Sequence, residues 1–244
     1  MKTMRSLLLL LALPVMVYAQ ANESFQARQA NLEDLSTANP ANTSAMTFDY
    51  SYRGVKGTPY RYDSWQKGVI WTRKDKTIEV GMLNIHLVDQ ILLAAVSPGN
   101  AAQIPADSLK RVVVAGTNDM VFVPLPVEEV EGQAASNKKG GRSAFYELLA
   151  EGRLSLYKRT EKPFMEANYK GAYSADRPYD EYMEENHYYV LHDGEYVEVK
   201  PRRRSIEKAL PAFKTQIREL VKAENLDLTT DEGMKELFRL LNGA

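Results

Sequence analysis

Apolar and polar residues alternate along most of the chain, and the period of the pattern lengthens from two to 3.6 after Arg204. A period of two gives strands with one buried face, whereas a period of 3.6 gives helices with one apolar face. Short alternating stretches separated by tight polar turns fill residues 46–200. The pattern therefore predicts a mainly β (α+β) protein, with a curved antiparallel sheet or partly open barrel followed by a C-terminal pair of short helices.

Four pairs of these stretches predict β-hairpins. The strongest signal is the turn at 193–194, because its Asp-Gly pair accepts the positive φ angles that a two-residue turn requires. The other three pairs are divided by polar residues at 74–76, 116–118 and 151–152. Residues 128–143 have no periodicity, and we expect a mobile excursion there.

Two amphipathic helices are predicted between residues 201 and 244. Pro211 suits the first turn of one helix, and Asn225 is its expected stop. The other begins at a capping box formed by Thr229 and Glu232. Ser205 is expected to cap a shorter helix ahead of both. The apolar faces consist of Phe213, Ile217, Leu220 and Val221 in the first helix and Met234, Leu237, Phe238 and Leu241 in the second.

The N-terminus has the features of a secretory signal peptide over residues 1–19. Charged residues precede an apolar run at 7–17, and small residues at Val17 and Ala19 fit signal peptidase. The run is about half the length that a membrane-spanning helix needs. Residues 20–45 are polar and predict a flexible leader. We therefore expect a periplasmic or secreted protein cleaved after Ala19, without a transmembrane segment after signal cleavage; an uncleaved N-terminal anchor is the alternative.

A basic run at 200–204 raises the question of nucleic-acid binding. It directly follows a stretch at 176–198 that contains eight acids, and the formal net charge of the chain is −1. Nucleic-acid-binding proteins usually spread basic charge over a face and add stacking aromatics. We interpret the run as a strand-to-helix junction paired with the neighbouring acids, and expect no nucleic-acid partner. Contact with an anionic envelope polymer or lipid is the alternative.

Motifs for catalysis or metal binding are absent from the sequence. The chain contains no cysteine, and no nucleophile elbow or phosphate-binding loop is present. Residues 180–187 offer acids and His187, but their spacing matches neither an EF-hand nor a zinc protease. We interpret them as a solvated acidic turn. We therefore expect no catalytic residue, no metal and no cofactor, and the protein is predicted not to be an enzyme; a hydrolase assembled from distant residues is the remaining alternative.

The 14 tyrosines are unevenly distributed along the chain. They could fill the interior of a curved sheet, or they could line a groove for a sugar, peptide or lipid. The candidate ligand-binding residues are Tyr50, Tyr52, Tyr60, Tyr62, Tyr173, Tyr179 and Tyr188.

Several short motifs carry a resemblance to a known group of proteins. They are Gly57-Thr58-Pro59-Tyr60, Lys170-Gly171-Ala172-Tyr173-Ser174, Tyr188-Tyr189-Val190-Leu191, Lys208-Ala209-Leu210-Pro211 and Leu237-Phe238 with Leu240-Leu241-Asn242. In these motifs the chain resembles a family of exported Bacteroidota proteins with an N-terminal signal peptide. The resemblance covers most of the mature chain. It implies export and a shared architecture, and it carries over no catalytic residue.

Together these features predict an exported, non-enzymatic protein that acts in binding or envelope maintenance through an aromatic-lined surface. The expected ligand is an envelope protein, a glycan or a lipid. The alternative is an adaptor or structural subunit of an envelope complex that docks through its C-terminal helices.

Overall fold

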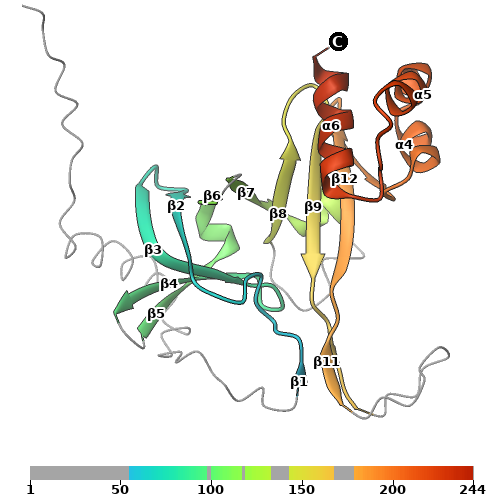
Figure 1. Ribbon diagram of the computed structural model, residues 1–244. Coiled ribbons are helices and arrows are strands. Elements are labelled where there is room, and N and C mark those ends of the chain that lie inside the picture. The colour runs from blue at the N-terminus through green and yellow to red at the C-terminus, as the bar shows by residue number, and fades with distance from the viewer. Residues whose placement is uncertain (1–54, 98–99, 117–118, 133–142, 168–178, 244) are drawn as a thin grey trace, which may run out of the picture.

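The computed structural model describes residues 55–97, 100–116, 119–132, 143–167 and 179–243 (Figure 1). The expected signal peptide and leader lie outside these residues. The candidate residues Tyr50, Tyr52 and Tyr173 also lie outside them.

A ten-stranded sheet forms most of the protein (Figure 1). From one edge to the other, its strands are β13 (Glu195–Val199), β12 (Glu185–His192), β9 (Ser155–Glu161), β8 (Ser143–Ala150), β7 (Met120–Pro126), β6 (Leu109–Val114), β2 (Gln66–Thr72), β3 (Thr77–His86), β4 (Ile91–Ser97) and β5 (Asn100–Pro105). All neighbouring strands are antiparallel. Among the described residues β13 and β5 form the two edges, so the sheet is open. The predicted fold class is confirmed as an open, curved sheet.

The four predicted hairpins are present as β2–β3, β6–β7, β8–β9 and β12–β13. In the last of these, Asp193 has a φ of 52° and Gly194 a φ of 83°, as the turn chemistry requires. The strands β4 and β5 lie within the predicted β region but were not individually predicted. Register shifts in β2, between Gln66 and Gly68, and in β8, between Leu148 and Ala150, mark irregularities that increase local twist.

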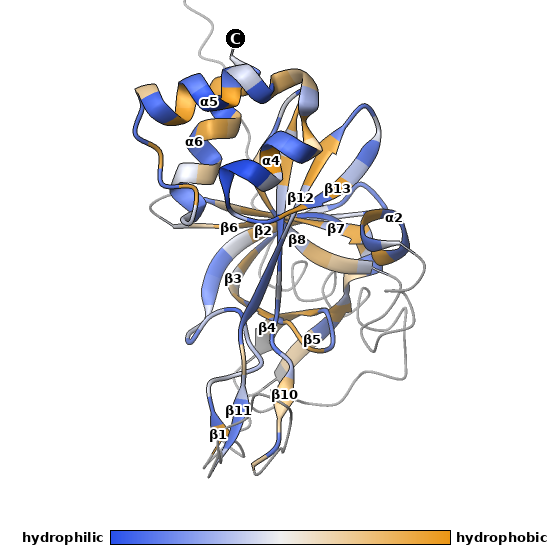
Figure 2. Cartoon of the chain, turned by 90° about the vertical axis from the view of Figure 1, so that its right-hand side faces the viewer, coloured by the Kyte–Doolittle hydropathy of each residue, from blue (hydrophilic) through white to orange (hydrophobic). Residues whose placement is uncertain are grey.

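The β8–β9–β12–β13 part of the sheet is covered by helices on both faces. On one face lie α4 (Arg203–Ala209), α5 (Lys214–Ala223) and α6 (Asp231–Asn242), whose buried side chains share a core with Leu156 and Val190. On the other face lies the short helix α2 (Val127–Glu131), whose valines pack among tyrosines. Figure 2 shows α2 and the C-terminal helices on different sides of β12 and β13.

A separate core lies in the β2–β6 part of the sheet. It consists mainly of aliphatic side chains such as Ile70, Leu83 and Ile104, which are fully buried. A small second sheet, formed by β1 (Val55–Lys56), β11 (Asp180–Tyr182) and β10 (Phe164–Met165), lies at the end of the molecule opposite the C-terminal helices (Figure 2). Its β1–β11 pair is parallel.

The helix α2 corrects the expectation of a mobile excursion over residues 128–143. Pro126 precedes the first helical residue, where a missing N–H costs nothing, and Gly132 ends the helix with a φ of 84°. Val127 and Val130, one turn apart, are both buried. A helix of five residues is too short to give a periodic sequence signal, and packing on the sheet stabilises it instead. Residues 133–142 lie outside the described residues.

The ends of the C-terminal helices differ from the predicted caps in two places. Ser205 lies inside α4, where its hydroxyl accepts a hydrogen bond from the backbone N–H of Lys200 at 2.9 Å. The cap of α6 is Thr230 and not Thr229, because the hydroxyl of Thr230 accepts from the N–H of Gly233 at 3.1 Å. The predicted stop at Asn225 is confirmed: α5 ends at Ala223, and Asn225 has a φ of 49°.

Among the described residues, no ion pair joins the basic run at 200–204 to the acidic stretch, contrary to expectation. Arg203 lies 3.5 Å from Glu207 within α4, and Glu207 forms a two-hydrogen-bond pair with Arg218 of α5. Within the described residues, the acids of 179–198 that form ion pairs do so with Lys56, Lys162 and the two histidines of β12. The ion pair of Arg203 thus lies within α4, where the two residues are one helical turn apart. None of the described helices has both the length and the apolar character needed to cross a membrane.

Candidate functional site

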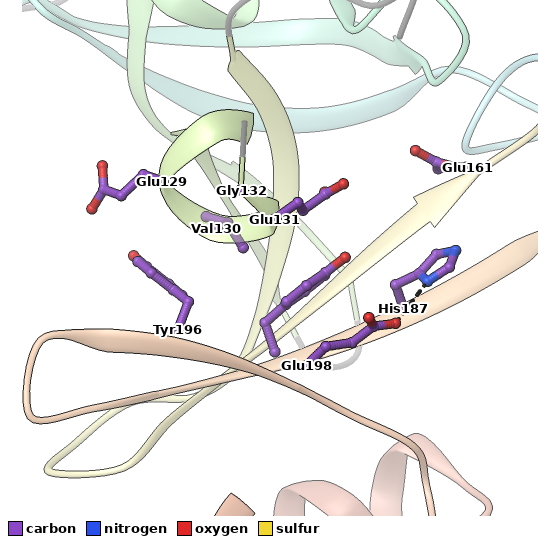
Figure 3. A pocket seen from close by; sticks show the side chains of 9 residues that line it. Glu129, Val130, Glu131, Gly132, Glu161, His187, Tyr196 and Glu198 are labelled. Carbon is purple, nitrogen blue, oxygen red and sulfur yellow. Dashed lines mark hydrogen bonds and ion pairs between the residues drawn. The ribbon is translucent and has the colours of Figure 1, made fainter. Parts of the chain in front are cut away.

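A pocket of about 520 Å³ lies on the α2 face of the sheet (Figure 3). This volume is in the range of small-ligand sites. It is lined by Glu129, Val130, Glu131 and Gly132 at the C-terminal end of α2, by Glu161 of β9, by His187 and Tyr189 of β12, and by Tyr196 and Glu198 of β13.

Strand register explains why these residues meet. Successive side chains of a strand point to opposite faces, so His187 and Tyr189 share the α2 face of β12, while Tyr188 points to the C-terminal helices. Across the ladder, Tyr189 pairs with Glu198, and His187 pairs with Arg159 of β9. The pocket wall is therefore built from alternate residues of three neighbouring strands.

Negative charge dominates the lining. Among the residues that the structure describes, four glutamates border the pocket, and Arg159, which lies next to the lining, is the arginine that forms ion pairs with them. Arg159 is 6% exposed and forms ion pairs with Glu131 and, at 2.7 Å, with Glu161. Burial disfavours its charge, but the hydrogen bond and charge of Glu131 and the charge of Glu161 outweigh burial, so the pKa of Arg159 is raised. Glu129 and Glu198 are exposed, and neither is among the glutamates that pair with Arg159.

Tyr189 and Tyr196 are the aromatic residues of the described lining, and each contacts a further tyrosine next to it. Tyr146 donates a hydrogen bond to Glu131 at 2.6 Å, and its ring contacts that of Tyr189 edge to face at 5.9 Å. The rings of Tyr157 and Tyr196 lie 5.8 Å apart. Burial, with the neighbouring Tyr157 and Glu129, raises the pKa of Tyr196 to about 12. Its hydroxyl is therefore neutral at physiological pH.

His187 is held by a carboxylate. Its Nδ1 lies 3.2 Å from the carboxylate of Glu198, the contact drawn as a dashed line in Figure 3. The ring is about one-third exposed and borders the pocket. The arrangement as a whole can hold a positively charged group between carboxylates and against aromatic faces.

None of the four candidate tyrosines within the described residues lines this pocket. Tyr60 is buried against His86, and Tyr62 packs on the β2–β6 core with its hydroxyl 3.7 Å from the sulfur of Met120. Tyr179 lies near the exposed Lys56. Tyr188 donates to Asp231 at 2.9 Å on the opposite face. The structure does not bring these four together.

The residues that sequence analysis missed are Tyr189, Tyr196 and the glutamates around them. A usable signal was present, because the alternation through the β12–β13 hairpin puts His187, Tyr189, Tyr196 and Glu198 on one face. The contribution of α2 could not be found in this way, since that segment had no periodicity.

A second charged cluster lies under α6 and has a structural role. Lys158 contacts Asp231 at 2.6 Å, and Asp231 also accepts from Tyr188. Glu147 lies 3.3 Å from Arg61 and 3.8 Å from Lys235. These contacts join the first turns of α6 to β8, β9 and β12.

Comparison with known proteins places no further constraint on the site: no family model, no curated protein and no solved structure matches the chain significantly. The resemblance to exported Bacteroidota proteins therefore stays a prediction.

Proposed function

We propose that this chain is an exported, non-enzymatic binding protein whose pocket between α2 and β9–β12–β13 holds a positively charged organic group. The ligand class is an ammonium or guanidinium group on an alkyl chain, as in a basic peptide or a polyamine. The observation that carries the proposal is a pocket whose described lining holds four glutamates and two tyrosines, with Arg159 paired to two of those glutamates.

Charge supports a cationic ligand over a glycan or an anionic lipid. Glu129 and Glu198 are the exposed carboxylates of the described lining. Glu129 lies on the same side as Tyr196 in Figure 3, and Glu198 is the ladder partner of Tyr189. A cation over a tyrosine face gains roughly 0.5–2 kcal/mol, depending on how far it is desolvated. An anionic ligand would meet like charge at the same positions.

The lining also favours binding over chemistry. The lining residues that the structure describes include no serine or threonine hydroxyl, no thiol and no lysine amine that could act as a nucleophile. The adaptor alternative is less well supported, because Leu237 and Phe238 of α6 are fully buried in the protein's own core. Those apolar faces are used within the chain.

Isothermal titration calorimetry with the mature protein, residues 20–244, tests the proposal. The probe is agmatine, which carries a guanidinium and an ammonium on a butyl chain. Glutarate and 1,5-pentanediol are the anionic and neutral controls of similar length. We expect agmatine alone to bind, with an affinity that falls as salt is added because exposed carboxylates contribute. Equal or stronger binding of glutarate would overturn the proposal.

A pair of variants on β13 makes the test specific to the pocket. Glu198→Gln removes a lining carboxylate, whereas Glu195→Gln changes an exposed glutamate of the same strand that does not line the pocket. We expect agmatine affinity to drop at least fivefold in the first and to stay within twofold in the second. Equal affinities in both variants would show that agmatine binds elsewhere.

Export is the other part of the proposal. The signal-peptide pattern of residues 1–19 supports it, and cleavage after Ala19 gives a mature protein beginning at Gln20. Intact-mass measurement of exported protein tests this, and material that retains residues 1–19 would contradict it.

A further inference from the structure

Two glutamates face each other at the end of the β9–β12 pair, next to the pocket. Glu161 is the last residue of β9, and it is the direct ladder partner of Glu185, the first residue of β12. Two residues along β12, on the same face, lies His187. One ligand atom from each of these three side chains lies within 4.8 Å of the other two.

Like charges directly opposite each other in a ladder destabilise the strand pair. Arg159 offsets one of the two, since it contacts Glu161 at 2.7 Å and also binds Glu131. Glu185 is exposed, and in the described residues no ion pair involves it. A cation between Glu161 and Glu185 would remove the repulsion that the register imposes.

His187 is oriented as histidine ligands of metals are. When the neutral ring donates its Nδ1–H to Glu198, at 3.2 Å, the Nε2 lone pair is left unprotonated. Figure 3 shows the ring's other nitrogen on the side away from Glu198, the side on which Glu161 lies. A carboxylate that fixes the tautomer of a histidine is the usual second partner of a metal-binding imidazole.

From this geometry we propose that Glu161, Glu185 and His187 bind one divalent transition-metal ion, with Zn²⁺ as the probe that the donor set favours. One imidazole nitrogen and two carboxylate oxygens suit Zn²⁺, whereas Ca²⁺ takes six to eight oxygen ligands. The three side chains leave the remaining coordination positions to water.

Only small side-chain movements are needed. Donor atoms around tetrahedral zinc lie about 3.4 Å apart, given bonds of about 2.0–2.1 Å. Glu185 is exposed and can rotate to close the gap from 4.8 Å. The site joins residues from two strands, so the spacing within 180–187 alone does not reveal it.

The metal site shares Glu161 and His187 with the pocket lining, but each proposal also has residues of its own. Glu185 belongs to the metal site and not to the pocket lining, whereas Glu129 and Tyr196 line the pocket and are not metal ligands. A change at Glu185 therefore tests the metal site, and a change at Glu129 tests the organic-cation site.

The experiment is calorimetry of mature protein treated with EDTA and then dialysed, titrated with ZnCl₂ at pH 7.5. We expect one Zn²⁺ per chain with a micromolar dissociation constant, together with a zinc-induced shift of the His187 ring resonances in NMR spectra. A stoichiometry other than one, or a dissociation constant above 1 mM, would overturn the proposal, as would equal affinity for CaCl₂.

Paired variants test the assignment. Glu185→Gln and His187→Gln should each weaken zinc binding at least tenfold, whereas the neighbouring Glu184→Gln and the same-strand His192→Gln should leave it within twofold. Zinc affinity that survives Glu185→Gln or falls equally in the controls would overturn the assignment. Glu185 is exposed, and unchanged melting of its variant verifies that the fold is intact.

The same variants separate the two proposals. Glu185→Gln should weaken zinc binding at least tenfold and leave agmatine binding within twofold, whereas Glu129→Gln should weaken agmatine binding and leave zinc binding within twofold. If zinc fails to bind and agmatine binds as expected, only the metal site is refuted. If agmatine fails and zinc binds, only the organic-cation site is refuted.

Discussion

Tyr188 and Tyr189 are neighbours in the chain, and their side chains lie on opposite faces of β12 in different cores. Tyr188 packs with the C-terminal helices and donates a 2.9 Å hydrogen bond to Asp231 at the start of α6. Tyr189 packs with the valines of α2 and lines the acidic pocket. One face of β12 thus packs in the core with the C-terminal helices, and its other face contributes to the candidate site.

Replacing Tyr188 by Phe should therefore affect stability without affecting binding. The change removes a hydrogen bond to a carboxylate, and such bonds contribute about 1.5–3 kcal/mol. We expect the free energy of unfolding in urea to fall by roughly that amount, with agmatine affinity unchanged. A drop in affinity at unchanged stability would mean that Tyr188 contributes to the site as the sequence predicted.

The same pair of residues shows what could be predicted from the sequence. Alternation establishes that two neighbouring residues of a strand lie on opposite faces, but it does not say which face meets solvent. That depends on what covers each face. The α6 helix was visible from its period, whereas α2, with only five residues, was not. Sequence analysis therefore named Tyr188 as a candidate, whereas Tyr189 is the tyrosine of this pair that lines the pocket.

Local features were predicted well, because their causes are local. The Asp193-Gly194 turn follows from backbone preference, and the apolar face of α6 follows from helical spacing. The candidate site depends instead on long-range pairing, such as that of Glu161 with Glu185. No property of either residue alone indicates that pairing.

Phe238 should be a major contributor to the stability of the whole protein. Its side chain is fully buried between α6 and the sheet, with Leu237 and Leu241. Truncating a buried phenylalanine typically costs about 3–5 kcal/mol. We expect Phe238→Ala to lower the unfolding free energy by more than about 2 kcal/mol.

The control for Phe238→Ala is Glu232→Ala, which changes an exposed residue of the same helix and should have little effect. Urea unfolding of both variants checks the expectation. An unshifted midpoint for Phe238→Ala would show that α6 does not hold the fold together, and it would favour the adaptor alternative.

Gly233, near the start of α6, and Gly243, directly after its end, can be replaced by alanine to test whether close packing requires a glycine. A Cβ on Gly233 would lie 2.0 Å from the carbonyl oxygen of Asp227, which is backbone and cannot move aside cheaply. On Gly243, the nearest atom would be 3.5 Å away, an ordinary contact. Alanine is the better helix former at Gly233, within α6, whereas Gly243 is the residue that caps its C-terminal end.

We therefore expect Gly233→Ala to destabilise the protein by more than about 2 kcal/mol, in the range of strained or overpacked substitutions. Gly243→Ala should change stability by less than about 0.5 kcal/mol, as surface substitutions usually do. Thermal and urea unfolding measure both. Equal changes in stability for the two variants would mean that the backbone at Asp227 moves to accommodate a Cβ at position 233. In that case the short distance to Asp227 would not explain why position 233 is a glycine.

His86 should make the stability of the fold depend on pH. Its ring is buried against Tyr60, with the ring centres 5.1 Å apart, and its Nδ1 accepts a hydrogen bond from the backbone N–H of Asp89 at 3.2 Å. Burial lowers the pKa of His86, and the nearby charge of Asp89 only partly opposes this. The folded protein therefore keeps this imidazole neutral at a pH where an exposed histidine is protonated.

The sign of the effect follows from proton binding. Below a pH of about 6.5, the ordinary histidine pKa, the His86 ring of the unfolded chain binds a proton, whereas the buried ring of the folded protein stays unprotonated. The free energy of unfolding should then fall as the pH is lowered, by up to about 1.4 kcal/mol per pH unit, until the folded pKa is reached. In His86→Gln this slope between pH 7 and pH 5.5 should flatten. Urea unfolding across this range measures the slopes, and the same slope in His86→Gln as in the unmodified protein would assign the pH dependence to other groups.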